Sequence, residues 1–410
     1  LTTIDSIVWG PAMIALLLGT HIYLTFRTGF IQRKLPQAIR MSVRRDPSGK
    51  GDISSFGALA TALAATIGTG SIVGVATALL AGGPGAIFWM WIAGLFGIAT
   101  KYVETYAAVK YRVRDKTGAM LGGAMFVWKR AFARPDGSVP WWATLGAVSF
   151  AAFAIIATIG TGSAVQAAAI SGIVTSSVPA IPAVVVGIVI VVAVAAVIFG
   201  GVNSIARVCE WLVPIMAGAY ALGCLVIMGM NAPVLGEAVG LILECAFTPK
   251  AAFGGAVGSG LIMALQFGCA RGLFSNESGL GTAPIVAAAA KTKNPADQAL
   301  ISMAGAFWST GVICLLTGLV LVSTMIVHPE NPYEVEFRHN AYGDVYGAYA
   351  DGLVAFKLDS LPDTNGKTVK LKLKWKSFDG DKSVEFNYCS RKSTPAKASI
   401  AAERSALNLK

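Results

Sequence analysis

Long apolar runs follow one another through the first four-fifths of this 410-residue chain. A helix that crosses the hydrocarbon core of a bilayer needs about 20 mostly apolar residues, because lipid offers no partner to an unpaired backbone N–H or C=O group. Eight such segments are found, at 6–26, 57–80, 85–110, 141–171, 181–200, 208–230, an interrupted 253–290, and 299–327. The sequence therefore predicts an all-α polytopic membrane protein with about eight spans.

The charged residues are few and stand mainly between the apolar runs. The chain is 13% charged and 55% hydrophobic, and residues 1–328 hold only 20 of its 33 basic and 11 of its 22 acidic side chains. Basic residues between apolar runs are typical of membrane topology signals rather than of polyanion binding. We therefore predict a lipid-embedded protein with no nucleic-acid partner, in spite of the net charge of +11.

The basic loops also predict an orientation. The loop 27–52 carries seven Lys and Arg residues against two Asp, which by the positive-inside rule places it in the cytoplasm and the N-terminus outside. Alternation then places 111–140, 201–207 and 291–298 inside, and each of these loops contains Lys or Arg. We expect a multi-pass protein of a bacterial-type cytoplasmic membrane.

Two segments differ from ordinary lipid-facing helices. The first, 64–74 (AATIGTGSIVG), places glycines and hydroxyl residues at mid-membrane, and the second, 268–284, places Arg271, Asn276 and Glu277 in an apolar run. Glycine is also used for close helix packing in membranes, so a packing face is the alternative for the first segment. A re-entrant or cytoplasmic loop is the alternative for the second. Buried charges in a membrane usually mark a functional site.

These two segments lie at corresponding places in two units of the chain. Each begins a unit, 57–231 or 253–328, and the two units enter the membrane from opposite sides. Broken helices at matching positions of inverted repeats indicate the binding site of a secondary transporter. Exposed backbone amides suit a carboxylate, and exposed carbonyls suit a monovalent cation. Thr66 and Gly68 at the first break are therefore candidates for cation coupling.

Three stretches resemble the alanine or glycine:cation symporter family: residues 51–104, GTGSAVQ at 160–166 and RGLFSNESGLGTAP at 271–284. The resemblance runs from about residue 3 to about 327 and implies a leucine-transporter-like fold, with an extra helix at 6–26 followed by two inverted five-helix repeats. It implies eleven helices, of which eight are found. A second repeat limited to 253–328, and hence a truncated fold, is expected.

The resemblance also implies a set of substrate-facing residues. They are Thr69, Gly70, Ser71, Gly162, Gln166, Phe274, Ser275 and Asn276. Phe274 would cover a small side chain and limit its size, and the family more often has Asn where Ser71 stands. Glu277 would pair with Arg271, in a structural salt bridge, or with a cation. For Asp52 and Glu104 we leave open a gating role or simple solvation.

Residues 329–410 differ in character from the rest and do not match the family. The stretch KTVKLKLKWKSF (367–378) alternates apolar and polar residues, which is typical of a half-buried β-strand, and EVEF, LVAFKL and VEFNY are possible companions. A small soluble β-rich domain is expected. The alternative is a disordered tail or a segment joined from elsewhere.

The function expected is symport of a small neutral amino acid such as alanine or glycine, driven by Na⁺ or H⁺. No paired-carboxylate or Ser/His/Asp arrangement is found, and GTGSIVG lacks the lysine of a phosphate-binding loop, so neither an enzyme nor ATP hydrolysis is expected. No organic cofactor and no metal beyond Na⁺ is predicted. One alternative is a non-transporting membrane protein, a sensor or receptor or an inactive truncated symporter, whose exported tail carries the function. A channel is the other. The oligomeric state is left open.

Overall fold

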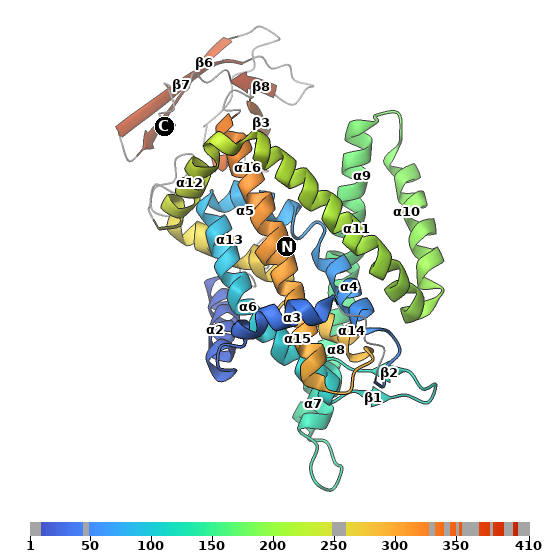
Figure 1. The fold of residues 1–410 in the computed structure, drawn as a ribbon. Helices are drawn as coiled ribbons and strands as arrows, with labels where there is room; N and C mark the ends of the chain where they lie inside the picture. The colour runs from blue at the N-terminus through green and yellow to red at the C-terminus, as the bar shows by residue number, and fades with distance from the viewer. Residues whose placement is uncertain are drawn as a thin grey trace. The chain divides into compact units, whose positions relative to one another are not determined.

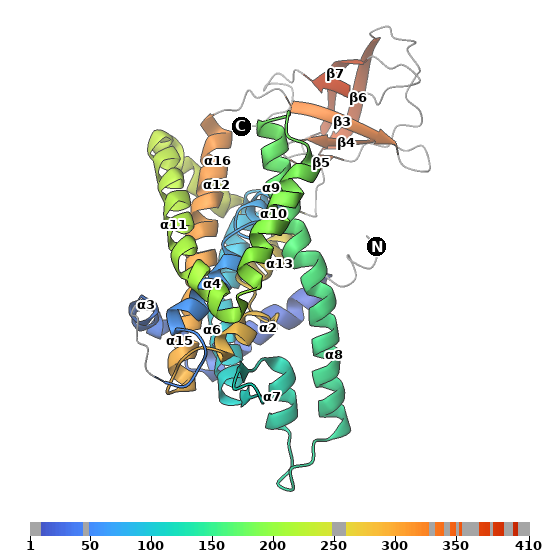
Figure 2. The same ribbon diagram turned by 90° about the vertical axis from the view of Figure 1, so that its right-hand side faces the viewer.

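The computed structural model describes residues 10–43, 49–247 and 260–327, together with six strands between residues 333 and 400. Figures 1 and 2 show these elements from two sides. The helices of the first half are α2 (Pro11–Arg27), the 3₁₀ helix η1 (Ile31–Lys34), α3 (Leu35–Ser42), α4 (Ser55–Thr66), α5 (Val73–Gly82), α6 (Gly85–Lys110), α7 (Ala124–Ala131), α8 (Trp141–Ala157), the π-helix η2 (Thr158–Ala164), α9 (Val165–Ser177) and α10 (Ala183–Ile198). Then follow α11 (Gly201–Met230), the 3₁₀ helix η3 (Ala232–Val234), α12 (Leu235–Phe247), α13 (Gly260–Asn276), α14 (Ala283–Ala288), α15 (Pro295–Ala306), the π-helix η5 (Phe307–Cys314) and α16 (Leu315–Val327).

In the described residues each expected span contains one or more helices, with non-helical stretches that include 67–72 and 277–282; positions 6–9 and 253–259 lie outside the described residues. Within the described part, four helices are long and apolar enough to cross a membrane: α6, α8–η2–α9, α11 and α15–η5–α16. A fifth is formed if α2 and the segment after it, bent by 68°, count as one span, and α4, α5 and α10 are shorter apolar helices. The chain is therefore a multi-pass membrane protein.

The apolar surfaces of α10 and α11 fit a lipid environment. Val184 in α10 and Trp211 in α11 each expose 72% of their surface, and many of their neighbours are similarly exposed. Soluble proteins rarely expose apolar patches of this extent, because water disfavours them, whereas lipid does not.

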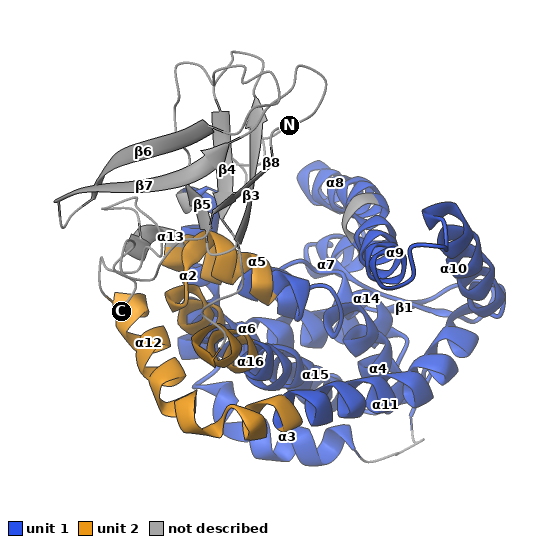
Figure 3. Cartoon of the chain, turned by 90° about the horizontal axis from the view of Figure 1, so that it is seen from above, with its two compact units in different colours: residues 1–74, 91–225, 271–317 blue, residues 75–90, 226–270, 318–410 orange. Residues whose placement is uncertain are grey.

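The helices divide between two compact units, which Figure 3 colours separately. The first contains residues 1–74, 91–225 and 271–317, and the second contains 75–90, 226–270 and 318–410. In the first unit, α3, α6 and α15 bury a core that includes Ala38, Ile98 and Met303.

The second unit has its own contacts. Phe247 of α12 packs against the rings of Phe88 and Trp89, with centroids 5.0 and 5.7 Å away, and the Trp89 indole donates a hydrogen bond to the Ala246 carbonyl (3.0 Å). Asn231 donates to Ser323 (3.3 Å).

Arg112, just after α6, joins three segments of the first unit. Its guanidinium donates to the carbonyls of Ala288 (2.9 Å), Ala290 (2.8 Å) and Lys50 (2.8 Å). Burial lowers the pKa of this guanidinium, and the nearby Asp52 carboxylate opposes that shift. Asp52 itself accepts a hydrogen bond from the Met120 amide (2.7 Å). The Asp52 side chain is thus engaged in local structure.

The strands that the structure describes form three sheets. A short antiparallel ladder joins β1 (Val113–Arg114) to β2 (Met120–Leu121). The remaining strands are β3 (Tyr333–His339), β4 (Val345–Tyr349), β5 (Gly352–Val354), β6 (Val369–Ser377), β7 (Gly380–Tyr388) and β8 (Lys397–Ile400). Their orders are β5-β4-β3-β8 and β6-β7. Of the alternating stretch expected at 367–378, residues 369–377 form β6, and positions 367, 368 and 378 lie outside the described residues. β6 pairs antiparallel with β7 from Val369↔Tyr388 to Ser377↔Gly380.

Candidate substrate and cation site

The first glycine-rich segment interrupts a helix. α4 ends at Thr66 and α5 begins at Val73, and we call residues 67–72 between them the first break. The Ser71 hydroxyl turns back to donate to the Thr66 carbonyl (2.6 Å), and the Gly74 amide donates to the Thr69 carbonyl (2.7 Å). The helix is therefore interrupted here.

The second segment is also a break. α13 ends at Asn276 and α14 begins at Ala283, and we call residues 277–282 the second break. Glu277, Gly279 and Gly281 have φ angles of +54°, +92° and +73°, so the chain leaves the helix in left-handed conformations. The Asn276 side chain accepts a hydrogen bond from the Ser278 amide (2.9 Å), and both residues are buried.

The first break and the end of α13 meet. A methyl group placed on Gly70 would lie 3.4 Å from the Cα of Ser275 and 3.6 Å from the ring of Phe274. One placed on Gly68 would lie 3.2 Å from the side-chain oxygen of Gln166. The structure thus brings Gly68 beside Gln166, Gly70 beside Phe274 and Ser275, and Ser71 beside Ser275; the Thr69 carbonyl accepts from the Gly74 amide.

Gly162 is placed differently. It lies in the π-helix η2, is exposed, and has only Thr158 near the position of a methyl group, at 3.8 Å. No described contact connects it to the other predicted residues.

A cluster of buried oxygens fills the junction between the first break and α13. We use the name hydroxyl cluster for Ser71, Ser275 and Ser309, whose hydroxyl oxygens lie 3.0 to 3.3 Å apart and which are each fully buried. Ser309 also donates to the Ser275 carbonyl (3.0 Å). The Thr66 carbonyl faces the same cluster.

Two further side chains support the hydroxyl cluster. Thr317 donates to the Ser71 carbonyl (3.1 Å) and is itself bonded to the Tyr220 hydroxyl (2.8 Å). Cys314 lies 3.0 Å from the Ser275 hydroxyl. Oxygens of this kind at broken helices are the ligands that transporters offer to Na⁺, since carbonyls and hydroxyls replace its water.

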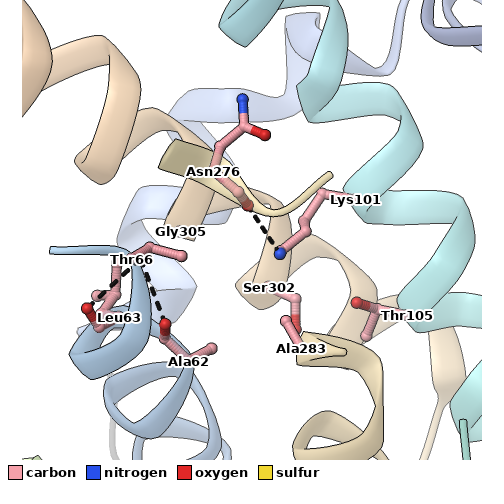
Figure 4. Close-up of a pocket in the computed structure, with 9 residues that line it drawn as sticks. All are labelled: Ala62, Leu63, Thr66, Lys101, Thr105, Asn276, Ala283, Ser302 and Gly305. Carbon is pink, nitrogen blue, oxygen red and sulfur yellow. Dashed lines mark hydrogen bonds between the residues drawn. The ribbon is translucent and has the colours of Figure 1, made fainter. Parts of the chain in front are cut away.

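Asn276 and Glu277 face α6 rather than the hydroxyl cluster. The Lys101 ammonium donates to the Asn276 carbonyl (2.9 Å), and both residues line a small pocket together with Thr66, Thr105 and Ser302 (Figure 4). The Glu277 carboxylate accepts from Thr282 (3.0 Å) and interacts electrostatically with Lys101. No ion pair joins Glu277 to Arg271 in the described part of the chain.

Several residues of this site were not predicted from the sequence. Lys101 had a visible signal, since it is a lysine in mid-span three residues before Glu104. Ser309, Thr317 and Tyr220 had none, because hydroxyl residues are common in membrane helices and only packing places these three beside the first break.

Broken helices that meet around buried carbonyls and hydroxyls, in a multi-pass membrane protein, define the transporter class. The family model for the sodium:alanine symporter family matches residues 1–360, and the chain belongs to that family. The match continues beyond residue 328. Members of this family are transporters and not enzymes.

The most similar relatives include transporters, in agreement with this assignment. An uncharacterized transporter of Haemophilus influenzae is 51% identical over 325 residues, which cover 79% of this chain and 69% of the relative. The sodium/alanine symporter AgcS of Methanococcus maripaludis is 48% identical over 78% of this chain and 69% of its own length. The probable sodium/glutamine symporter GlnT of Bacillus subtilis is 33% identical over 86% and 71%.

Proposed function

We propose that this protein carries a small neutral amino acid such as alanine or glycine across the cytoplasmic membrane together with Na⁺. The meeting of the first break with the end of α13 is the observation that carries this function, because it places unwound backbone beside Gln166, Phe274 and a buried oxygen cluster. The relative AgcS is a sodium/alanine symporter, which supports alanine as the substrate and Na⁺ as the coupling ion in this proposal.

The parts of the site have different roles in this proposal. Backbone groups of Thr69 and Gly70, with Gln166, bind the charged ends of the amino acid, and Phe274 limits the size of its side chain. The hydroxyl cluster and the Thr66 carbonyl bind the cation. The cluster contains no carboxylate, which favours a singly charged ion, because a divalent one would lack a compensating negative charge.

The proposed architecture is the leucine-transporter-like arrangement of inverted repeats, with its boundary at residue 328 and the N-terminus outside. The two breaks at the starts of 57–231 and 253–328 support it.

Uptake of radiolabelled alanine into proteoliposomes tests this function. The full 410-residue chain should accumulate alanine when Na⁺ is high outside and lose that accumulation when K⁺ replaces Na⁺. A proton gradient imposed without Na⁺ separates the two possible coupling ions, and unlabelled glycine and glutamine as competitors test the substrate range. Absent or gradient-independent uptake would overturn the proposal.

A further inference from the structure

A lysine lies buried in the middle of the longest uninterrupted helix of the first half. Lys101 in α6 exposes only 3% of its surface. Removing an ammonium group from water costs several kcal/mol unless opposite charges and hydrogen-bond acceptors replace the lost solvent. The groups around Lys101 therefore indicate what it does.

One partner is the end of α13. The Lys101 ammonium donates to the carbonyl of Asn276, the last residue of that helix, at 2.9 Å, as the dashed line in Figure 4 shows. The last carbonyls of a helix have no partner within it and carry the negative end of the helix dipole. A cation at this position donates a hydrogen bond to an unpartnered carbonyl and also interacts favourably with the negative end of the dipole.

Two carboxylates complete the arrangement. Glu277, the first residue of the second break, and Glu104, one turn after Lys101 on α6, both attract the ammonium. Glu104 also interacts with the backbone amides of Gly279 and Gly281. One face of α6 thus contacts the second break at its start and again in its middle.

The backbone of the second break needs such support. Glu277 has a side chain and still adopts φ +54°, a conformation that costs about 1–3 kcal/mol and persists only where the surroundings enforce it. α6 can approach the second break closely because Gly97 faces it. A methyl group on Gly97 would be 3.1 Å from the side-chain nitrogen of Asn276 and 3.2 Å from the Ser278 hydroxyl.

Of the other elements packed against the break, α2 brings a titratable side chain beside it in the part of the chain that the structure describes. His21 of α2 is fully buried, is bonded through Nδ1 to Thr100 (2.7 Å), and lies beside Gly279, where a methyl group would be 3.6 Å from its ring. The cluster therefore holds one ammonium against two carboxylates. Loss of the ammonium would remove the cation that attracts both carboxylates.

The geometry assigns Lys101 as a positioning residue: its ammonium, with Glu104, anchors the second break to α6 and so holds Phe274 and Ser275, at the end of α13, in the geometry that binds substrate. The substrate part of this assignment rests on the proposed function; the anchoring part does not.

Hydrogen exchange of the purified full chain in nanodiscs tests the anchor without transport. In Lys101→Met, amides of residues 273–284 should exchange at least about tenfold faster, because removal of one partner from a buried charge pair costs a few kcal/mol. Peptides from α8 should be unchanged. The matched control is Lys110→Met, which removes an exposed lysine from the end of the same helix. Unchanged exchange at 273–284 in Lys101→Met would overturn the assignment.

Transport kinetics separate positioning from a general structural role. Lys101→Met should raise the KM for alanine by about tenfold or more, in line with the loss of a charge partner, and Lys101→Arg should recover part of the loss. If the Lys101→Met protein cannot be produced in the membrane, the double variant Lys101→Met/Glu104→Gln is used. It restores the original net charge but lacks the anchor. Wild-type kinetics in this double variant would overturn the assignment.

The two proposals fail in different ways. If the wild-type chain takes up no alanine while the exchange difference at 273–284 remains, the proposed function fails and the anchoring by Lys101 holds. If wild-type uptake is sodium-dependent and Lys101→Met matches it in both KM and exchange, only the assignment of Lys101 fails.

Discussion

At the scale of single residues, Phe274 is the side chain that we propose selects substrates. Its ring lies against Gly70, so any larger substituent at the first break meets it. The prediction that Phe274 borders the substrate came from a resemblance in sequence, and the structure places the ring beside that break. Its role toward a bound amino acid remains a proposal.

Replacing Phe274 by alanine should widen the range of substrates. Leucine and glutamine should inhibit labelled alanine uptake about tenfold more strongly in Phe274→Ala than in the wild type, because pocket volume for one or two extra methylenes is worth about 1–3 kcal/mol. Phe153→Ala is the control, since that phenylalanine is 71% exposed on α8. An unchanged inhibition pattern in Phe274→Ala would remove Phe274 from the specificity determinants.

At the scale of secondary-structure elements, the two breaks were predictable and the two π-helices were not. Glycines at 68, 70 and 74, and the polar run 275–278, conflict with a plain apolar helix, so the interruptions are visible in the sequence. A π-helix differs from its neighbours by one wider turn, with no marked change in composition. η5 nevertheless carries Ser309 and so shapes the hydroxyl cluster.

Arg112 allows a test of how the segments around α6 are held together. Arg112→Gln should destabilise the protein by roughly 2 kcal/mol, because buried carbonyls at Ala288 and Ala290 would lose a charged donor. Thermal unfolding in detergent measures the effect as a lower midpoint. Arg114→Gln, which changes an exposed neighbour in β1, should leave the midpoint unchanged. Equal midpoints for the two variants would contradict the bridging role of Arg112.

At the scale of the whole molecule, topology is the prediction that remains open to a direct measurement. In intact cells, a membrane-impermeant maleimide should label Ser177→Cys, at the end of α9, and should label Ala133→Cys only after permeabilisation. Both positions are exposed in the structure. Labelling of the parent chain measures the background from its own cysteines, which in the described part are buried or half-buried. The opposite labelling pattern would reverse the proposed orientation.

The sequence by itself determined the class of protein, the helical segments and the interruptions in two of them. These properties follow from the local balance between apolar and polar residues, which lipid selects without reference to distant parts of the chain. It also identified the family, through contiguous motifs.

Only the tertiary structure decided which side chains meet. Ser71 and Ser309 are separated by 238 positions and lie 3.1 Å apart, and Lys101 and Asn276 are separated by 175 and share a hydrogen bond. Contacts of this kind depend on how helices pack, and packing has no periodic signature in a single sequence. For that reason the broken helices were foreseen, while the hydroxyl cluster and the lysine that supports the second break were not.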